Sequence, residues 1–355
     1  MNGAKTEPMY VSVKKYILNG IIESQFKPNE KLPSERMLTD MFKTSHITVR
    51  RAMSDLVNEG AVYRVKGKGS FVTQTRTDKR KIQIMQMLAS NVSQDGSLVD
   101  IARGSGRYMT KRGIGIQGDY VTPGPVNENE YIRNLISERS RGAMLFLTEP
   151  ENNVHMFKEL DRAEIPYVLI DRFPYSYQVN SVTSNNIAGG YTQTAHLISM
   201  GHERIVFVLN RYTLNTEKER QLGYLECMAA KIPAIPPIVI WYDENFTNEV
   251  LRLYNDGLVT ALAVVNDLTA MKIIQNLESA GLKFPHDLSI IGYDNWEPAR
   301  FVKPALTTIR QDFELMGYQG AKLLYENMND KSVRGKVVFV PVSLVERDSV
   351  ARRQV

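Results

Sequence analysis

The first 45 residues carry two helical patterns of apolar and polar positions. Apolar residues recur every three or four positions over residues 10–24, which predicts a first helix there. Pro28 interrupts the pattern because proline cannot continue a helix. Ser34 followed by Glu35 is typical of a helix start, so we expect a second helix that ends near Phe42.

A third helix and a small hairpin follow in the pattern. Thr44 or Ser45 is suited to cap a helix whose buried side carries apolar residues from Val49 to Val57. Two short strands are then expected within residues 62–73, because apolar and polar positions alternate there. The connection Lys66-Gly67-Lys68-Gly69 contains the glycines that a tight turn requires.

Three short helices and a hairpin in this order predict a winged helix-turn-helix, a module that enters a DNA groove. The third helix is the expected reading helix, and Arg50 on it can pair with guanine through two hydrogen bonds. The flanking basic residues are suited to phosphates or to the minor groove. The residues that we expect to contact DNA are Arg36, Ser45, His46, Thr48, Arg50, Lys66, Lys68 and Gly69.

Beyond a polar, charge-rich segment over residues 75–81, apolar runs alternate with amphipathic segments. Expected strands are 82–88, 113–116, 143–147, 167–170, 205–209, 238–240, 261–265 and 289–291. Expected helices are 131–137, 154–163, 191–200, 221–229 and 270–279. This repeated strand–helix order predicts a doubly wound α/β body with parallel sheets. We therefore expect a DNA-binding domain over residues 1–74, a linker over 75–81 and a sensor and dimerisation domain over 82–355.

Polar residues stand directly after several of the expected strands. They are Glu149, Asp171, Asn266 and Asp294. Doubly wound sheets bind ligands at the carboxyl ends of their strands, where carboxylates and amides can bind pairs of hydroxyls. The alternative for each residue is that it caps the following helix. Phe246, Trp241 and Trp296 are candidates for an aromatic residue that covers an apolar ring face, although we expect Trp241 in the core rather than against a ligand.

Charge divides the chain in the same way as the patterns do. Residues 1–81 hold 16 Lys and Arg against 8 Asp and Glu, whereas the remaining residues hold 28 against 31. The basic excess of the whole chain therefore lies in the part that carries the DNA-binding pattern, which indicates a polyanion partner for that part alone.

Other classes of protein find little support in the sequence. Cys227 is the only cysteine, and no apolar run approaches the roughly 20 residues that span a bilayer, so we expect a cytoplasmic protein without a membrane partner. The five histidines are scattered without metal-ligand spacing, and the segment Gly104-Ser105-Gly106 is no phosphate-binding loop. We expect no cofactor, no metal and no catalytic activity.

The N-terminal motifs resemble the GntR family of bacterial winged-helix regulators. That family's pattern is met at Leu32–Glu35, Ser45–Arg50, Glu59-Gly60 and Gly67–Val72. His46 stands where the family usually has an arginine. The resemblance implies a winged helix that reads operator DNA, with a change in the contact that position 46 makes.

The larger domain resembles the sensor domain of the LacI/GalR family. The matching segments are Leu169–Arg172, Asn186–Tyr191, Met200–Ile205, Glu219–Tyr224, Val265–Asp267, Ile291–Asp294 and Ala305–Gln311. The resemblance implies that Arg220, Asn266 and Asp294 contact an effector and that Phe246 stacks on it. Asn185 replaces a common aspartate, and residues 89–96 lack the usual Asn-Pro-Phe-Phe, so no contact is carried over to either.

A GntR-type head on a LacI/GalR-type body is the combination of the bacterial arabinose repressors. The resemblance implies a homodimer that binds double-stranded operator DNA and is released by a sugar, with L-arabinose favoured. The residue chemistry alone indicates only a small sugar or polyol. An activator, a regulator that responds to another sugar or to a sugar phosphate, and more remotely an enzyme with a fused DNA-binding head remain alternatives.

Overall fold

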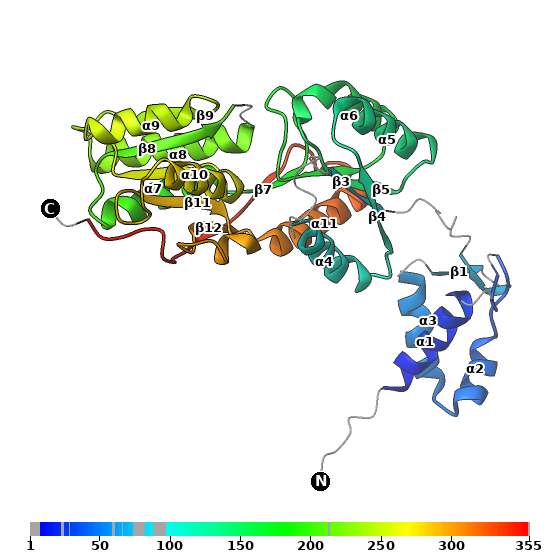
Figure 1. The fold of residues 1–355 in the computed structure, drawn as a ribbon. Coiled ribbons are helices and arrows are strands. Elements are labelled where there is room, and N and C mark those ends of the chain that lie inside the picture. Colours follow the sequence, from blue (N-terminus) through cyan, green and yellow to red (C-terminus); the bar gives the residue numbers. More distant parts are fainter. Residues whose placement is uncertain are drawn as a thin grey trace, which may run out of the picture. The chain divides into compact units, whose positions relative to one another are not determined.

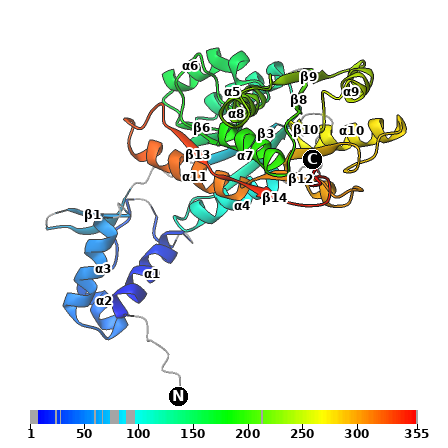
Figure 2. The ribbon, with the colours of Figure 1, turned by 90° about the vertical axis from the view of Figure 1, so that its left-hand side faces the viewer.

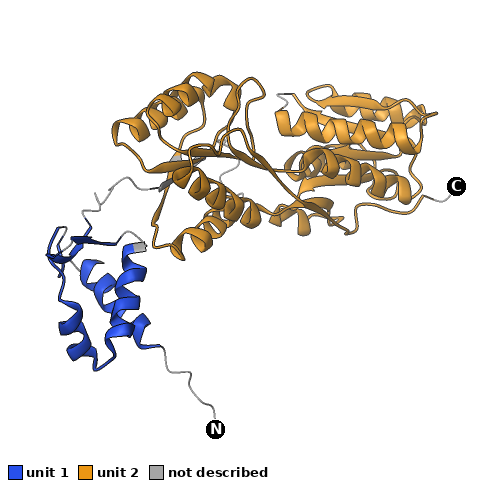
Figure 3. Ribbon diagram, turned by 180° about the vertical axis from the view of Figure 1, so that it is seen from behind, with its two compact units in different colours: residues 1–79 blue, residues 80–355 orange. Residues whose placement is uncertain are grey.

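A computed structural model of the chain describes residues 8–22, 25–27, 29–58, 61–65, 67–73, 82–87, 97–211 and 214–353. The expected linker over residues 75–81 and the loop over 89–96 lie outside these residues. The chain forms two compact units, residues 1–79 and 80–355 (Figure 3). No helix in the described part is long and apolar enough to cross a membrane.

The first unit is a winged helix-turn-helix, as the sequence pattern predicts. It contains α1 (Met9–Ile22), α2 (Glu35–Phe42) and α3 (His46–Asn58), followed by the antiparallel strands β1 (Val62–Val65) and β2 (Gly69–Val72). Ser34 caps α2 as expected, because its Oγ accepts a hydrogen bond from the backbone N–H of Met37 at 3.2 Å.

The core of this unit forms from one side of each helix and from the wing. The buried residues are Val13, Ile17, Leu32, Leu38, Val49, Ala52, Met53, Leu56, Val62 and Val72. A segment before α2 also pairs with the wing, since the N–H of Leu32 donates to the carbonyl of Ser70. The wing is therefore joined to the segment before α2 by backbone hydrogen bonds and to the helices by apolar packing.

The second unit consists of two lobes, each built on a six-stranded sheet (Figure 1). In lobe 1 the strand order is β13 (Val337–Val340), β7 (Ser181–Ser184), β6 (Tyr167–Ile170), β5 (Gly142–Phe146), β3 (Ile82–Met87) and β4 (Ile116–Val121), all parallel. In lobe 2 the order is β14 (Val342–Val345), β12 (Thr307–Gln311), β11 (Ser289–Asp294), β10 (Ala261–Val264), β8 (Ile205–Asn210) and β9 (Ile238–Tyr242), with only β14 antiparallel. This is the doubly wound α/β architecture that the sequence predicts.

Helices cover both faces of each sheet (Figure 2). In lobe 1, α4 (Ser97–Thr110) and α11 (Phe313–Asn329) cover one face, and α5 (Pro125–Ser137) and α6 (Val154–Arg162) cover the other. In lobe 2, α7 (Asn186–Ser199) and α8 (Asn215–Lys231) cover one face, and α9 (Phe246–Asn255) and α10 (Asp267–Ser279) cover the other. Two short 3-10 helices, η1 (Pro150–Asn153) and η2 (Glu297–Arg300), complete the described elements.

The chain passes between the lobes three times within the described residues, from β7 to α7, from β12 to α11 and from β13 to β14. In the first two passages, the end of a strand in one lobe is followed within two residues by the start of a helix in the other lobe. This connection places polar residues from both lobes around one region.

Glycines permit close approach of the two main helix pairs. A Cβ added at Gly104 of α4 would lie 1.9 Å from the carbonyl oxygen of Glu314 in the first turn of α11. A Cβ added at Gly223 of α8 would lie 2.0 Å from the carbonyl oxygen of Ile187 on α7. Gly104 belongs to the segment Gly104–Gly106, which is no phosphate-binding loop. Its absent side chain lets α4 and α11 pack closely.

Two groups of sequence predictions differ from the structure. The strand expected at 113–116 is wrong: Gly113 has a φ of +68° in a turn, and β4 begins only at Ile116. The sequence pattern also gave no indication of the helices α4, α9 and α11 or of the strands β7, β12, β13 and β14. β7 is Ser-Val-Thr-Ser and is buried along its whole length, so it shows no apolar run.

Candidate DNA-contact surface and effector site

The first turn of α3 presents polar side chains beside one exposed apolar residue. Ser45 precedes the helix, and its Oγ accepts from the N–H of Thr48 at 3.2 Å and lies 2.8 Å from the Thr48 hydroxyl. His46 and Arg50 are exposed, and Ile47 between them is 82% exposed. None of these three side chains is part of the core, so they are available to contact a partner.

Glu35 joins the start of α2 to the start of α3 and to the wing. Its carboxylate accepts a hydrogen bond from Arg64 Nη2 of β1 at 2.8 Å, and its other oxygen lies 3.8 Å from Nδ1 of His46. Glu35 therefore links α2 to the wing through Arg64, and its carboxylate lies near His46 at the start of α3.

The wing tip has the backbone that its glycines allow. Gly67 and Gly69 have φ values of +75° and +116°, which side chains other than glycine rarely adopt. Lys68 between them is exposed, and so is Arg36 in the first turn of α2. Lys66, the other basic residue expected at the wing, lies outside the described residues.

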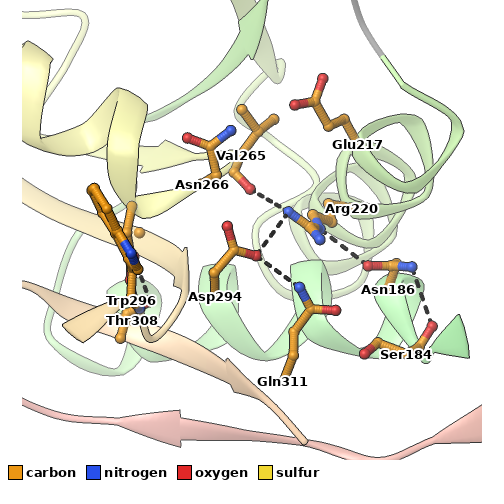
Figure 4. Close-up of polar contacts among 12 residues, drawn as sticks. Ser184, Asn186, Glu217, Arg220, Val265, Asn266, Asp294, Trp296, Thr308 and Gln311 are labelled. Carbon is orange, nitrogen blue, oxygen red and sulfur yellow. Dashed lines mark hydrogen bonds and ion pairs between the residues drawn. The ribbon is translucent and has the colours of Figure 1, made fainter. Parts of the chain in front are cut away.

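Arg220 of α8 lies at the centre of the polar residues that follow the strands of lobe 2 (Figure 4). Its Nε donates to Oδ1 of Asn186 at 3.0 Å, and its Nη1 donates to the carbonyl of Val265 at 2.6 Å. The guanidinium carbon lies 3.8 Å from the centre of the Tyr293 ring. These contacts fix the guanidinium where β10 and β11 end.

Asp294 ends β11 beside this arginine. Its Oδ1 lies 3.5 Å from Arg220 Nη1 and accepts a hydrogen bond from Nε2 of Gln311 at 2.7 Å. The φ of Asp294 is +110°, a strained value that turns the chain directly after the strand. Gln311 ends β12, and the sequence pattern does not mark it because it does not mark β12 itself as a strand.

The charges of this group stabilise the positive form of Arg220. Burial lowers the pKa of the Arg220 guanidinium, but the negative charges around it, Asp294 foremost, raise the pKa above its ordinary value. Asp171 and Glu217 also contribute to this rise. Asp171 directly follows β6 in lobe 1, so carboxylates of both lobes act on one arginine.

The two expected effector contacts of lobe 1 differ in their surroundings. Asp171 is 5% exposed, has a φ of +67°, and its Oδ2 lies 3.4 Å from Nε of Arg172. Glu149 is exposed, and its Oε2 accepts a hydrogen bond from Asn152 at 2.8 Å. The structure therefore brings Asp171 into electrostatic contact with Arg220, whereas a contact of Glu149 with an effector stays a prediction.

The two remaining expected contacts of lobe 2 have structural partners. Asn266 caps α10, because its Oδ1 accepts from the N–H of Thr269 at 2.8 Å. Phe246 is only 1% exposed and packs in the core against Tyr242, with 5.2 Å between ring centres. This burial leaves little of the Phe246 ring for a ligand. Stacking of Phe246 on a sugar stays a prediction, and the burial does not favour it.

Several polar atoms of the described residues in this region are buried without a hydrogen-bond partner. They are Oδ1 of Asp171, Oγ of Ser184 and Oε1 of Gln311. Burial without a partner costs about 1–3 kcal/mol for each such atom. Hydroxyl groups can donate to oxygens of all three kinds, and of these three residues Gln311 lines the cavity described next.

A cavity of about 1200 Å³ meets this polar group at Asp294 and Gln311. Its other walls come from the first turns of α4, from η2 and from the start of α11. Trp296 and Phe301 supply aromatic surface, and Arg103, Arg107 and Arg310 supply positive charge. Mixed aromatic and polar walls are typical of a small-molecule site.

Matches to family models agree with the two units. Residues 9–72 match the bacterial regulatory proteins of the gntR family, and residues 194–350 match the periplasmic binding protein-like domain. The LacI family transcriptional regulator of Enterococcus faecium, whose structure holds bound ribose, superposes with a TM-score of 0.63 at 23% identity. That match covers 77% of this chain and 100% of the other, and it shows the fold of the sensor unit.

Two relatives carry the comparison further. The arabinose metabolism transcriptional repressor of Geobacillus stearothermophilus is 28% identical over 359 residues, which cover 97% of this chain and 98% of that repressor. The HTH-type transcriptional repressor PurR of Vibrio atlanticus is 31% identical over 231 residues, which cover 63% of this chain and 68% of that repressor.

Proposed function

Because the chain belongs to the bacterial transcriptional repressors that carry a periplasmic-binding-protein-like sensor, here with a GntR-type head, we propose that it represses carbohydrate-utilisation genes until a sugar releases it. L-arabinose is the favoured sugar, since the relative that matches along nearly the whole chain is an arabinose metabolism repressor. A repressor of this kind acts by binding alone and works in the cytoplasm, where bacterial DNA lies.

The observation that carries this proposal is the polar group around Arg220. Asp171 and Gln311 present buried acceptors that have no partner among the described residues, and Asp294 beside them is partly exposed and borders the cavity. Such a group offers several hydrogen-bond acceptors to a compact molecule with adjacent hydroxyls, which describes a pentose or hexose.

For the DNA side, we expect α3 to enter the major groove. Arg50 and His46 then read or approach base edges, while the wing residues Lys66 and Lys68 contact phosphates or the minor groove. Ser45, Thr48, Gly69 and Arg36 complete the expected contact set. A homodimer is proposed because one such head reads only a short half-site, and two-fold symmetry supplies affinity and spacing.

The test combines two measurements on the full chain. Isothermal titration calorimetry with L-arabinose, D-ribose, D-glucose and D-galactose identifies the ligand, and a gel shift with the control region of neighbouring sugar genes measures operator release. We expect L-arabinose to bind and to release the operator. Binding of none of these sugars, or sugar binding that leaves the operator complex unchanged, would contradict the proposal.

One observation favours a second class of effector. Three arginines, Arg103, Arg107 and Arg310, line the cavity, and arginine is well suited to phosphate. Two of them already pair with carboxylates, Arg103 with Asp100 and Arg107 with Glu314. A sugar phosphate is therefore the alternative effector, and arabinose 5-phosphate in the same titration distinguishes it from the free sugar.

A further inference from the structure

A hydrogen bond between two side chains joins the lobes of the sensor beside the polar group. Tyr175 lies after β6 in lobe 1, and Glu219 lies on α8 in lobe 2. The hydroxyl of Tyr175 donates to Oε1 of Glu219 at 2.6 Å. Burial and the neighbouring Glu219 carboxylate raise the pKa of the Tyr175 phenol, so it stays protonated and donates at neutral pH.

The loop that carries Tyr175 is held in place within lobe 1. Glu151 of η1 accepts hydrogen bonds from the N–H of Tyr175 at 2.5 Å and from the hydroxyl of Ser176 at 2.5 Å. Burial raises the pKa of Glu151, but the hydrogen bonds from Ser176 and Tyr175 lower it overall, which keeps the carboxylate charged. Tyr175 is thus presented to lobe 2 by a loop with few remaining degrees of freedom.

Glu219 connects Tyr175 to the polar group around Arg220. Its second oxygen, Oε2, accepts from Nδ2 of Asn186 at 3.1 Å, and Oδ1 of Asn186 accepts from Nε of Arg220 at 3.0 Å. Arg220 in turn lies 3.5 Å from Asp294. A continuous series of polar contacts therefore runs from Tyr175 in lobe 1 to Asp294 at the cavity.

We propose that Tyr175 and Glu219 form an inter-lobe latch that positions Asn186 and Arg220 for the effector. This proposal rests on the proposed function, which supplies the identity of the effector as a sugar. Moving the lobes apart breaks the Tyr175–Glu219 bond because the two residues belong to different lobes. An effector held by residues of both lobes favours the same arrangement, so latch and effector strengthen each other.

The chain contains a matched control for the latch. Tyr177 is two residues further along, and its hydroxyl donates to Oδ2 of Asp161 at 2.7 Å, but both partners belong to lobe 1. Tyr175→Phe and Tyr177→Phe each remove one phenol–carboxylate hydrogen bond from the same segment. Only the first of them removes a bond between the lobes.

The first experiment measures L-arabinose affinity of the full-length protein by calorimetry. We expect Tyr175→Phe to weaken binding about threefold to tenfold, which corresponds to the net contribution of one ordinary hydrogen bond, and Tyr177→Phe to leave it unchanged. Glu219→Ala should weaken it further, and Tyr175→Phe should add no loss in the Glu219→Ala background. Either of two results would overturn the latch. In the first, Tyr175→Phe binds L-arabinose with the parent's affinity. In the second, the losses from Tyr175→Phe and Glu219→Ala multiply in the double variant.

The second experiment needs no ligand and separates failure of the latch from failure of the proposed function. Hydrogen exchange of the full chain reports on residues 186–191 and 215–222, which carry Asn186 and Arg220. We expect Tyr175→Phe to accelerate exchange there and Tyr177→Phe to leave it at the parent rate. If no sugar binds the parent protein, the proposed function fails, while unchanged exchange in Tyr175→Phe rejects the latch on its own.

Discussion

The carboxylate of Asp294 lies 3.5 Å from the guanidinium of Arg220, and the two residues come from different elements, β11 and α8. The arginine side chain is 6% exposed and the aspartate side chain is 31% exposed. Asp294 therefore connects a buried, permanently charged group to the cavity. An effector that contacts Asp294 changes the surroundings of Arg220 directly.

Asp294→Ala should make the repressor resistant to release by sugar while it still binds its operator. Loss of charge-assisted hydrogen bonds to the sugar hydroxyls corresponds to roughly 1.5–3 kcal/mol. Gel-shift titration with L-arabinose measures the shift. Asp256→Ala is the control, since Asp256 pairs with Arg252 on the surface of the same lobe. Release of the Asp294 variant at the parent's sugar concentration would remove this residue from the site.

Arg50 and Lys68 should differ in how they support DNA binding. Arg50→Ala should cost roughly 1–3 kcal/mol on the operator and relax the preference at one base pair, because the lost contact is to a base. Lys68→Ala should weaken operator and random DNA alike and flatten the salt dependence. Binding measured at several salt concentrations on both DNAs checks this, and equal losses on both for Arg50→Ala argue against base reading.

Ile47 should read the methyl group of a thymine. It is 82% exposed, the highest value for a large apolar side chain in the described part of the chain, and it lies one helical turn before Arg50. Replacing one thymine at a time by deoxyuridine in a selected operator should weaken binding about fourfold at one position, and Ile47→Ala should abolish that difference. Met37→Ala, another exposed apolar change, serves as the control.

Gly104 and Gly106 of α4 should respond in opposite ways to alanine. At Gly104 the new Cβ would lie 1.9 Å from the Glu314 carbonyl oxygen, so the helices must separate, at a cost of roughly 1–3 kcal/mol or more. At Gly106 no atom lies within 4 Å, so alanine should stabilise the helix by roughly 0.5–1 kcal/mol. Urea denaturation compares the two, and a neutral Gly104→Ala would show that the helices adjust freely.

The sensor should lose stability on mild acidification through its buried histidines. Burial lowers the pKa of His202 below its ordinary value of 6.5, and burial does the same for His196. Below pH 6.5 the unfolded chain therefore binds protons that the folded chain does not, so the free energy of unfolding falls as pH falls through this window. His202→Gln should reduce this slope, which urea denaturation between pH 7.5 and 5 measures. An unchanged slope would assign the effect to other groups.

Local sequence signals determined much of the first unit and the positions of the candidate site. Ser34 and Ser45 cap helices because a side-chain oxygen near a free N–H acts over three residues, and Gly67 and Gly69 shape the wing by their own backbone freedom. Parallel strands end at one edge of a sheet, so a polar residue shortly after an apolar run, such as Asp294 after Ile291, can be found without a structure.

The tertiary structure alone decided which of these residues meet. Asn186, Glu219 and Tyr175 carry no local pattern that marks their contacts, and β7 is a buried strand without an apolar run. It also decided that Asp171 is buried whereas Glu149 is exposed and that Phe246 lies in the core. Local pattern specifies helices, strands and caps because these form between near neighbours in the chain. Contacts across the two lobes depend on packing between segments far apart in sequence, which no local pattern encodes.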